Sequence, residues 1–239
     1  MQVLPALIIW IALVVVGGLA VRRPLREIRR LRRAAHTPIG LLPPAEIVEV
    51  AGQASGSDLR SPLTDTPCVF WQVEVEAYRS SGRHGGWITL FNQASTAPLT
   101  IDDGTAQVQV LPAETELHLS DDLRATRGLF KEFNPEIAAK LAQMGLPTHG
   151  HPDTWRSSMR AYERTIASGE HVFVVGAVDY STGQTVIGPS ADGPVMLADR
   201  SEGALLKRAY LKVGWNAAGL ALLMFIGCWV FLASVLVHQ

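Results

Sequence analysis

The sequence predicts a membrane protein in which two transmembrane helices flank a mainly antiparallel β domain with minor helices. The helices are predicted by two segments, 3–21 and 213–237, that carry no charged residue. Each is long enough to cross about 30 Å of hydrocarbon at ~1.5 Å per residue. The β domain is predicted by short apolar runs that alternate with turn residues between these segments, a pattern typical of strands joined by turns.

The first apolar segment is predicted to be an uncleaved anchor rather than a signal peptide. Only Met1 and Gln2 precede it, and the positive charge follows it. A secretory signal peptide has the opposite order and ends in a small-residue cleavage site. The stretch Gly17–Ala20 is only loosely similar to such a site.

Basic residues predict how the chain is oriented. They crowd next to the two apolar segments, while neither terminus carries Lys or Arg beyond them. Since cytoplasmic flanks are enriched in Lys and Arg, we expect the central domain on the cytoplasmic side of the inner (plasma) membrane and both termini outside. The residues concerned are Arg22, Arg23, Arg26, Arg29, Arg30, Arg32, Arg33, Lys207, Arg208 and Lys212.

The arginines fall on a predicted juxtamembrane helix, residues 22–36. Leu25, Ile28 and Leu31 form a narrow apolar stripe along it. Such a helix could lie on an anionic lipid surface. The alternative is that its arginines serve only as topology signals.

Composition excludes several classes of protein. The 239 residues carry a formal charge of −1, and because the cations gather near the apolar segments, the body of the domain is acidic. Nucleic-acid binding is therefore not expected. Cys68 and Cys228 lie in different predicted regions, so a disulfide between them is not expected and a reducing compartment fits. Nucleotide-binding and CxxC motifs are missing from the sequence, and we expect no cofactor.

The central domain divides into short elements. Asn134 and Pro135 begin a predicted helix that Gly145 ends. Asp103 and Gly104 predict a hairpin turn, and 80–86 a flexible loop. The segment 158–167 fits either a helix or a strand. Predicted strands cover 46–54, 67–78, 87–91, 98–101, 106–111, 171–178 and 195–198, and a further helix begins at Glu202.

Glu74 and Glu76 are candidates for chemistry or for binding. They lie on one face of the predicted strand 67–78, opposite the apolar face that carries Val73 and Val75. Paired carboxylates can perform acid–base work. They can also form a solvated face or a polar contact surface for a partner.

Cys68, His149 and His151 are the remaining chemical candidates. A nucleophilic Cys68 would need a nearby histidine and an electropositive setting, but its place at the start of an apolar strand predicts a packed, inert thiol. Two histidines separated by one residue could bind a metal, although a structural site usually needs two more ligands. The intervening Gly150 and following Pro152 favour an ordinary loop.

Three segments resemble the GIDE-type domain, also called the "beside a membrane" (BAM) domain. The first, 61–76, reads Ser-Pro-Leu-Thr, a short gap, Pro-Cys, and an aromatic strand ending in glutamates. The second, 169–176, is Gly-Glu followed by an apolar strand and Gly, and the third is 197–206. The residues that carry the resemblance include Ser61, Pro62, Leu63, Pro67, Cys68, Trp71, Glu74, Glu76, Gly169, Glu170, Gly176, Asp199 and Arg200.

The resemblance implies that 46–206 is one GIDE-like domain. Family members in organelles are membrane E3 ubiquitin ligases with a C-terminal zinc-binding RING. This chain ends at Gln239, soon after the second apolar segment, and lacks the Cys/His ligand set of a RING. The resemblance therefore argues against ligase activity here, and bacterial relatives without the RING have no established reaction.

Together, these observations predict a non-enzymatic scaffold or accessory subunit of a membrane protein assembly. Its partners would be other membrane proteins or a second copy of the chain. Two alternatives stay open at this point. One is a thiol- or metal-dependent enzyme built on Cys68 or on His149 and His151, and the other is a module that responds to anionic lipid through residues 22–33.

Overall fold

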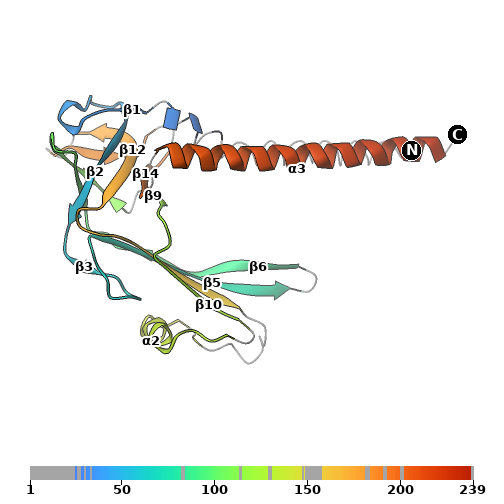
Figure 1. Ribbon diagram of the computed structural model, residues 1–239, viewed down its shortest axis with the longest axis horizontal. Helices are drawn as coiled ribbons and strands as arrows, with labels where there is room; N and C mark the ends of the chain where they lie inside the picture. Colours follow the sequence, from blue (N-terminus) through green and yellow to red (C-terminus); the bar gives the residue numbers. More distant parts are fainter. Residues whose placement is uncertain are drawn as a thin grey trace. The chain divides into compact units, whose positions relative to one another are not determined.

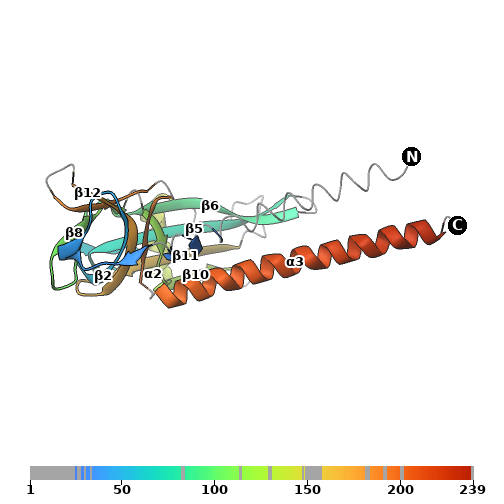
Figure 2. The ribbon, with the colours of Figure 1, turned by 90° about the horizontal axis from the view of Figure 1, so that it is seen from above.

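A computed structural model describes most of the chain, and its contacts divide it into two units. One unit is 35–200, and the other joins 1–34 with 201–239. We describe each unit by itself (Figures 1 and 2). The described residues are 25, 28–29, 31–32, 34–81, 84–112, 115–128, 131–146, 148, 158–180, 184–190, 193–199 and 202–237.

The prediction of a membrane protein with two transmembrane helices is wrong. Among the described residues, no helix is long and apolar enough to cross a membrane. The first predicted segment, 3–21, lies outside those residues. The second, 213–237, falls within α3 (Glu202–Val237).

A closed five-stranded β-barrel forms one half of the unit 35–200. Its strands pair in the order β2-β7-β8-β13-β12, and β12 pairs back to β2. Every pair is antiparallel except β8 with β13. This is the connectivity of the Greek-key OB-fold barrel. The strands are β2 (Ile47–Gly56), β7 (Leu99–Asp102), β8 (Gln107–Val110), β12 (His171–Asp179) and β13 (Val186–Gly188).

Short elements extend the barrel. β1 runs parallel to β2, β14 pairs with β12, and β9 runs parallel to β14. A separate two-stranded sheet joins β3 to β4. Their bounds are β1 (Ala35–His36), η1 (Ile39–Leu41), β3 (Leu59–Arg60), β4 (Pro67–Cys68), β9 (Thr115–His118) and β14 (Val195–Ala198).

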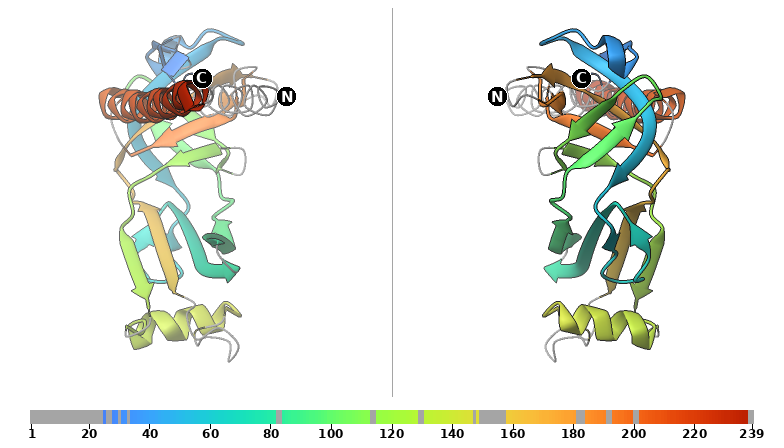
Figure 3. Two further views of the ribbon diagram at one scale, coloured as in Figure 1. Left: turned by 90° about the vertical axis from the view of Figure 1, so that its right-hand side faces the viewer. Right: turned by 90° about the vertical axis from the view of Figure 1, so that its left-hand side faces the viewer.

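The second half of the unit is a four-stranded antiparallel sheet in the order β10-β11-β5-β6. Its strands are inserted between barrel strands: β5 and β6 between β2 and β7, and β10 and β11 between β8 and β12. Figure 3 shows the barrel above and this sheet below, with α2 beneath it. The elements are β5 (Phe70–Ser81), β6 (His84–Ala94), β10 (Leu123–Arg127), β11 (Met159–Ile166) and α2 (Pro135–Gln143).

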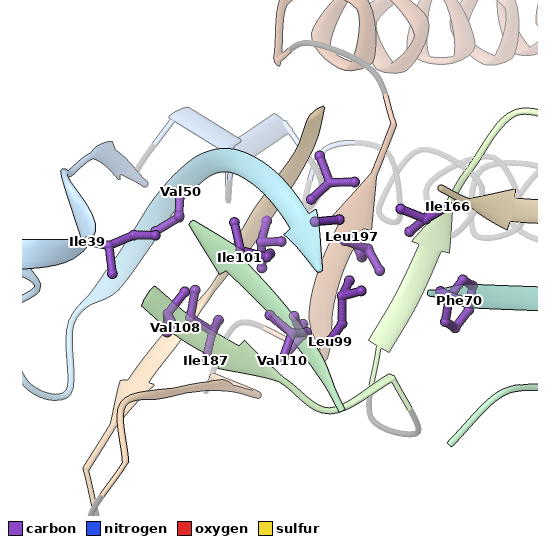
Figure 4. Packing of buried hydrophobic residues seen from close by; sticks show 14 of the residues in the cluster. Ile39, Val50, Phe70, Leu99, Ile101, Val108, Val110, Ile166, Ile187 and Leu197 are labelled. Carbon is purple, nitrogen blue, oxygen red and sulfur yellow. The ribbon is translucent and has the colours of Figure 1, made fainter. Parts of the chain in front are cut away.

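Each half of the unit has its own hydrophobic core. Leu99, Ile101, Val108 and Val110 alternate inward from β7 and β8 to fill the barrel (Figure 4). In the second core, Ile137 and Leu141 of α2 pack against apolar residues of the sheet. These include Leu63, Val73, Val75, Phe133, Met159 and Ala161.

Several sequence predictions are confirmed. Asn134 caps α2 by accepting a hydrogen bond from the N–H of Glu136 at 3.1 Å, and Gly145 follows the helix with a φ of +74°. The segment 158–167 contains strand β11. The predicted loop 80–86 is wrong in extent, because β5 continues to Ser81 and β6 begins at His84. The strands β1, β3, β9, β10 and β13 were not predicted, and β1 takes the last two residues of the predicted helix 22–36.

Two glycines permit the barrel to close. A Cβ at Gly52 would lie 2.5 Å from the carbonyl oxygen of Asp102, and a Cβ at Gly176 would lie 2.7 Å from that of Gly188. Such distances are far inside van der Waals contact, so any side chain here would push β7 or β13 away. Glycine in these strands therefore marks a close backbone approach.

The β7–β8 turn holds η1 in place. Asp103 accepts a hydrogen bond from the N–H of Ile39 at 2.7 Å and others from the hydroxyl and N–H of Thr105 at 2.6 and 2.8 Å. Burial raises the pKa of Asp103, but these hydrogen bonds outweigh it and lower the pKa to about 2. The predicted Asp-Gly hairpin turn is confirmed, with Asp102 opposite Gln107.

We predict that Gly176→Ala destabilises the full chain by about 1–3 kcal/mol, because the added methyl overpacks the β12–β13 contact. Gly188→Ala is the matched control in a neighbouring strand, since a Cβ there meets nothing within 4 Å. The free energy of unfolding, measured in urea for both variants, checks this. Equal losses for the two variants would contradict it.

We also predict that Asp103→Asn destabilises the protein only where the carboxylate is charged. The folded pKa lies below the unfolded value of ~3.9, so the stabilisation is present above about pH 4 and is lost as the pH falls through about 2. Urea unfolding should show that the difference in free energy of unfolding between wild type and variant becomes smaller between about pH 6 and pH 2. If that difference in free energy did not change with pH, the charge of Asp103 would not be the source of the stabilisation.

Candidate functional site

One face of the four-stranded sheet carries ion pairs between β5 and β11. Glu76 lies directly opposite Arg160 and Glu74 opposite Tyr162. Glu76 accepts a hydrogen bond from Nε of Arg160 at 2.5 Å, and Glu74 accepts one from Nη1 of Arg164 at 3.1 Å. The predicted polar face is confirmed. Each carboxylate is held by a guanidinium, which favours a binding surface over acid–base work.

Aromatic rings lie among these charges. Trp87 of β6 stands opposite Tyr78 of β5, and their rings meet edge to face with centroids 5.6 Å apart. The guanidinium of Arg160 stacks on Trp87, 3.9 Å from the ring centroid. Such cation–π contacts contribute about 0.5–1 kcal/mol at exposed sites.

Tyr162, at the centre of β11, is surrounded by three guanidinium groups. Those of Arg124, Arg160 and Arg164 each lie 5.6 Å from its ring centroid. We call this surface the arginine–aromatic face. It comprises Glu74, Glu76, Tyr78, Trp87, Arg124, Arg160, Tyr162 and Arg164.

The ion pairs fix the geometry of the arginine–aromatic face more than they stabilise the fold. The hydrogen bond to Glu76 raises the pKa of Arg160 above its ordinary value, so this cation is charged throughout the physiological range. Arg164 also donates to Asp121 at 2.9 Å and to Gln72 at 3.1 Å. Partly exposed pairs contribute only about 0.2–1 kcal/mol each, but together they restrict both arginines to one orientation.

The motif loop that begins at Ser61 is bound to the other face of the sheet by a buried carboxylate. Glu163 of β11 has none of its surface exposed. It accepts hydrogen bonds from the N–H of Leu63 at 2.7 Å, the N–H of Thr64 at 3.1 Å and the hydroxyl of Thr64 at 2.5 Å. The side chain of Leu63 enters the second core. Glu163 therefore joins the motif loop to the sheet.

Glu163 is a residue that the sequence reasoning missed. The sequence of 158–167 fits either a helix or a strand, so it does not define which of its residues share a face. Read as a strand, it places Met159, Ala161 and Glu163 on the apolar face and the arginines on the other. A carboxylate in an apolar row would have been the signal, because a buried charge needs bound donors.

Cys68 ends β4, where it pairs with Leu59 of β3. Only 4% of its surface is exposed. Burial and the negative charge of Glu163 both raise the pKa of the thiol. A reactive cysteine needs the opposite setting, with its pKa lowered by positive charge and with access to solvent. The prediction of a packed Cys68 is confirmed.

The other motif residues occupy structural positions. Gly169 has a φ of +82° in the turn between β11 and β12, and Glu170 accepts a hydrogen bond from the N–H of Ala167 at 2.8 Å. Asp199 accepts one from the N–H of Ser120 at 2.6 Å. Trp71 packs against the second core. Ser61 closes the motif loop, because its N–H donates to the carbonyl of Thr66 and its carbonyl accepts from the N–H of Asp65, both at 3.0 Å. Pro62 follows in that loop, Pro67 begins β4 and Gly176 lies in β12. Arg200 is outside the described residues.

The candidate metal ligands His149 and His151 lie outside the described residues. In the part of the chain that the structure describes, no group of three or more His, Cys, Asp and Glu could hold a metal ion. The two histidines therefore stay a prediction.

The basic residues flanking the apolar segments are described in part, within the unit that contains α3. The guanidinium of Arg32 lies 5.6 Å from the ring centroid of Tyr210. Ile28 and Leu31 of the predicted stripe are buried, whereas Leu25 keeps 45% of its surface exposed. Arg29, Lys207 and Lys212 are exposed. Contact with lipid, the sidedness of the chain and its cellular location stay predictions. Arg22, Arg23, Arg26, Arg30, Arg33 and the side chain of Arg208 lie outside the description.

We predict that Glu163→Gln destabilises the protein by about 1–3 kcal/mol, because the amide cannot accept all the hydrogen bonds that the carboxylate accepts. Glu170→Gln is the control, since Glu170 accepts its hydrogen bond at an exposed turn. Urea unfolding of both variants in the full chain checks the difference. A loss for Glu163→Gln no larger than that of the control would contradict a joining role for Glu163.

Comparison with known proteins identifies the family. The family model GIDE, described as E3 ubiquitin ligase, matches residues 72–233, well over half of the 239 residues. The matched range includes the arginine–aromatic face and the Gly169 and Asp199 segments, whereas the motif loop at Ser61 precedes it. Neither a curated protein nor a solved structure matches. The chain belongs to the GIDE family, which is linked to E3 ubiquitin ligases.

Proposed function

We propose that this chain is a non-enzymatic binding protein whose arginine–aromatic face holds another protein, as a scaffold or accessory subunit does. The observation that carries the proposal is the set of stacked and ion-paired side chains on β5, β6, β10 and β11. They form one continuous face on regular strands, which position side chains more rigidly than loops do.

The composition of the face supports protein binding. Trp, Tyr and Arg are the residues most enriched among those that dominate the energy of protein–protein interfaces. This face carries Tyr78, Trp87 and Tyr162 among its arginines. Trp87 and Tyr78 retain more than a third of their surface exposed.

The ion pairs also support binding by arranging the surface in advance. Ordering a flexible side chain at an interface costs ~0.5–1.5 kcal/mol. Arg160 and Arg164 are already held by Glu76 and Glu74, so this cost is reduced. Because both signs of charge are present in fixed positions, the face would select a partner whose charges complement them.

Family membership points the same way, because a ubiquitin ligase must bind other proteins to act. For the alternative of a thiol enzyme, the burial of Cys68 and its raised pKa count against it. The proposal therefore places the function of the described residues in recognition.

We predict that Arg124→Glu lowers recovery of a stoichiometric protein partner by ~10-fold or more, because it reverses a charge on the exposed edge of this face. The test is quantitative affinity purification of the tagged full chain from its native cells. Arg60→Glu is the matched control, an exposed arginine whose ion pair with Asp65 lies on the separate β3–β4 sheet.

Circular dichroism must show both variants folded. Equal recovery with Arg124→Glu and Arg60→Glu would place the partner elsewhere on the chain. Recovery of the wild type without any stoichiometric protein would overturn the proposed function.

A further inference from the structure

The two edges of the four-stranded sheet differ. β10 spans only five residues, of which Arg124 and Arg127 are charged. Short length and charge are devices that keep a sheet edge from pairing with another chain. β6 is the opposite edge and spans eleven residues, His84–Ala94, without any Asp, Glu, Lys, Arg or Pro. Its sequence has none of the residues that protect an edge.

The segment Gly85–Thr89 is the open and regular part of β6. All its residues are exposed, and Trp87 and Ile88 keep 39% and 40% of their surface in solvent. Within the described residues, only β5 pairs with β6. The pairing is regular up to Thr89, after which a bulge leaves Leu90 without an opposite residue on β5. A second strand could therefore add most easily to the segment before the bulge.

We infer that this edge pairs with the same segment of a second copy of the chain. The two strands would run antiparallel about a two-fold axis at Trp87, making one eight-stranded sheet from two four-stranded sheets. This inference goes beyond the proposed function, because it concerns self-association through the backbone edge of β6. Trp87 is the one residue of that edge segment that also belongs to the arginine–aromatic face.

The order of residues within the segment favours a second copy over another partner. A two-fold axis at Trp87 sets Ile88 opposite the partner's Gly86, where a Cβ would meet nothing within 4 Å. Thr89 falls opposite the partner's Gly85, whose missing side chain leaves room for the ring of Tyr78. Trp87 meets the partner's Trp87, and aromatic cross-strand pairs stabilise sheets. Ile88 and Gly86 are therefore complementary in size across the two-fold axis.

The absence of charge on the segment Gly85–Thr89 also favours a second copy of the chain. An isologous interface places every residue near its own copy, so a charged strand would repel itself. The segment itself carries no charge. Of the cations on the neighbouring strands, Arg79 is exposed and lies opposite Gly86, and Arg160 is paired with Glu76 and stacked on Trp87.

The test begins with the mass of the full chain in solution, by sedimentation equilibrium over a concentration series. We expect a dimer, and we expect Ile88→Lys to raise its dissociation constant ~10-fold or more, because it places a charge inside the strand pair. Gln93→Lys is the matched control on the same strand, exposed but beyond the bulge, and should leave the constant unchanged.

A cysteine pair tests the register. Gly86→Cys and Ile88→Cys chains, mixed and mildly oxidised, should form a disulfide-linked heterodimer, because directly opposite Cα atoms lie ~4.5–5.5 Å apart. A Cβ at Gly86 meets nothing within 4 Å, and the buried Cys68 should not compete. Gly86→Cys mixed with Gln93→Cys is the control and should remain unlinked.

Three results would overturn the inference. One is a monomer at all concentrations up to about 100 μM, which would leave the edge for a different chain. Another is a dimer that Ile88→Lys does not weaken. The third is the absence of the 86–88 disulfide in a mixture that is dimeric.

Discussion

The pairing of Phe70 with Ile166 is the contact on which the arrangement of the unit 35–200 depends. These residues end the β5–β11 ladder, and both are fully buried in the barrel core. The N–H of Val69 donates to the carbonyl of Ile166 at 2.8 Å just beyond the pair. Since the same two strands continue into the four-stranded sheet, the barrel core fixes where that sheet begins and which of its faces is turned toward α2.

The arginine–aromatic face depends on this register. With Phe70 opposite Ile166, Glu76 falls opposite Arg160 and Glu74 lies diagonal to Arg164. A shift by one residue would turn the arginines toward the second core and bury their charges. Glu163 stabilises the same register from the other face, because only in this register does its carboxylate reach the backbone N–H groups of Leu63 and Thr64.

Local features of the sequence predict local structure here, and little beyond it. The alternation of Val73 and Val75 with Glu74 and Glu76, the cap at Asn134 and the Asp-Gly turn all lie within a few residues of their partners. The barrel cannot be predicted from such local features, because its β8–β13 and β2–β12 pairs join segments that are distant in the sequence. The arginines that complete the face lie 84 and 90 residues from the glutamates they bind. The apolar run 213–237 shows the length and hydropathy of a segment, but it does not show that the helix containing it begins at Glu202.

The connectivity of the barrel also has a kinetic consequence. Val50 of β2 pairs with Val174 of β12, so the barrel cannot close during synthesis until the chain beyond β12 has emerged. The β5–β6 hairpin is contiguous in sequence and forms much earlier, since local pairs avoid the entropy of closing a long loop. The uncharged β6 edge is therefore exposed while the rest of the unit is still open. Newly made chains can therefore pair with one another through this strand before the barrel exists.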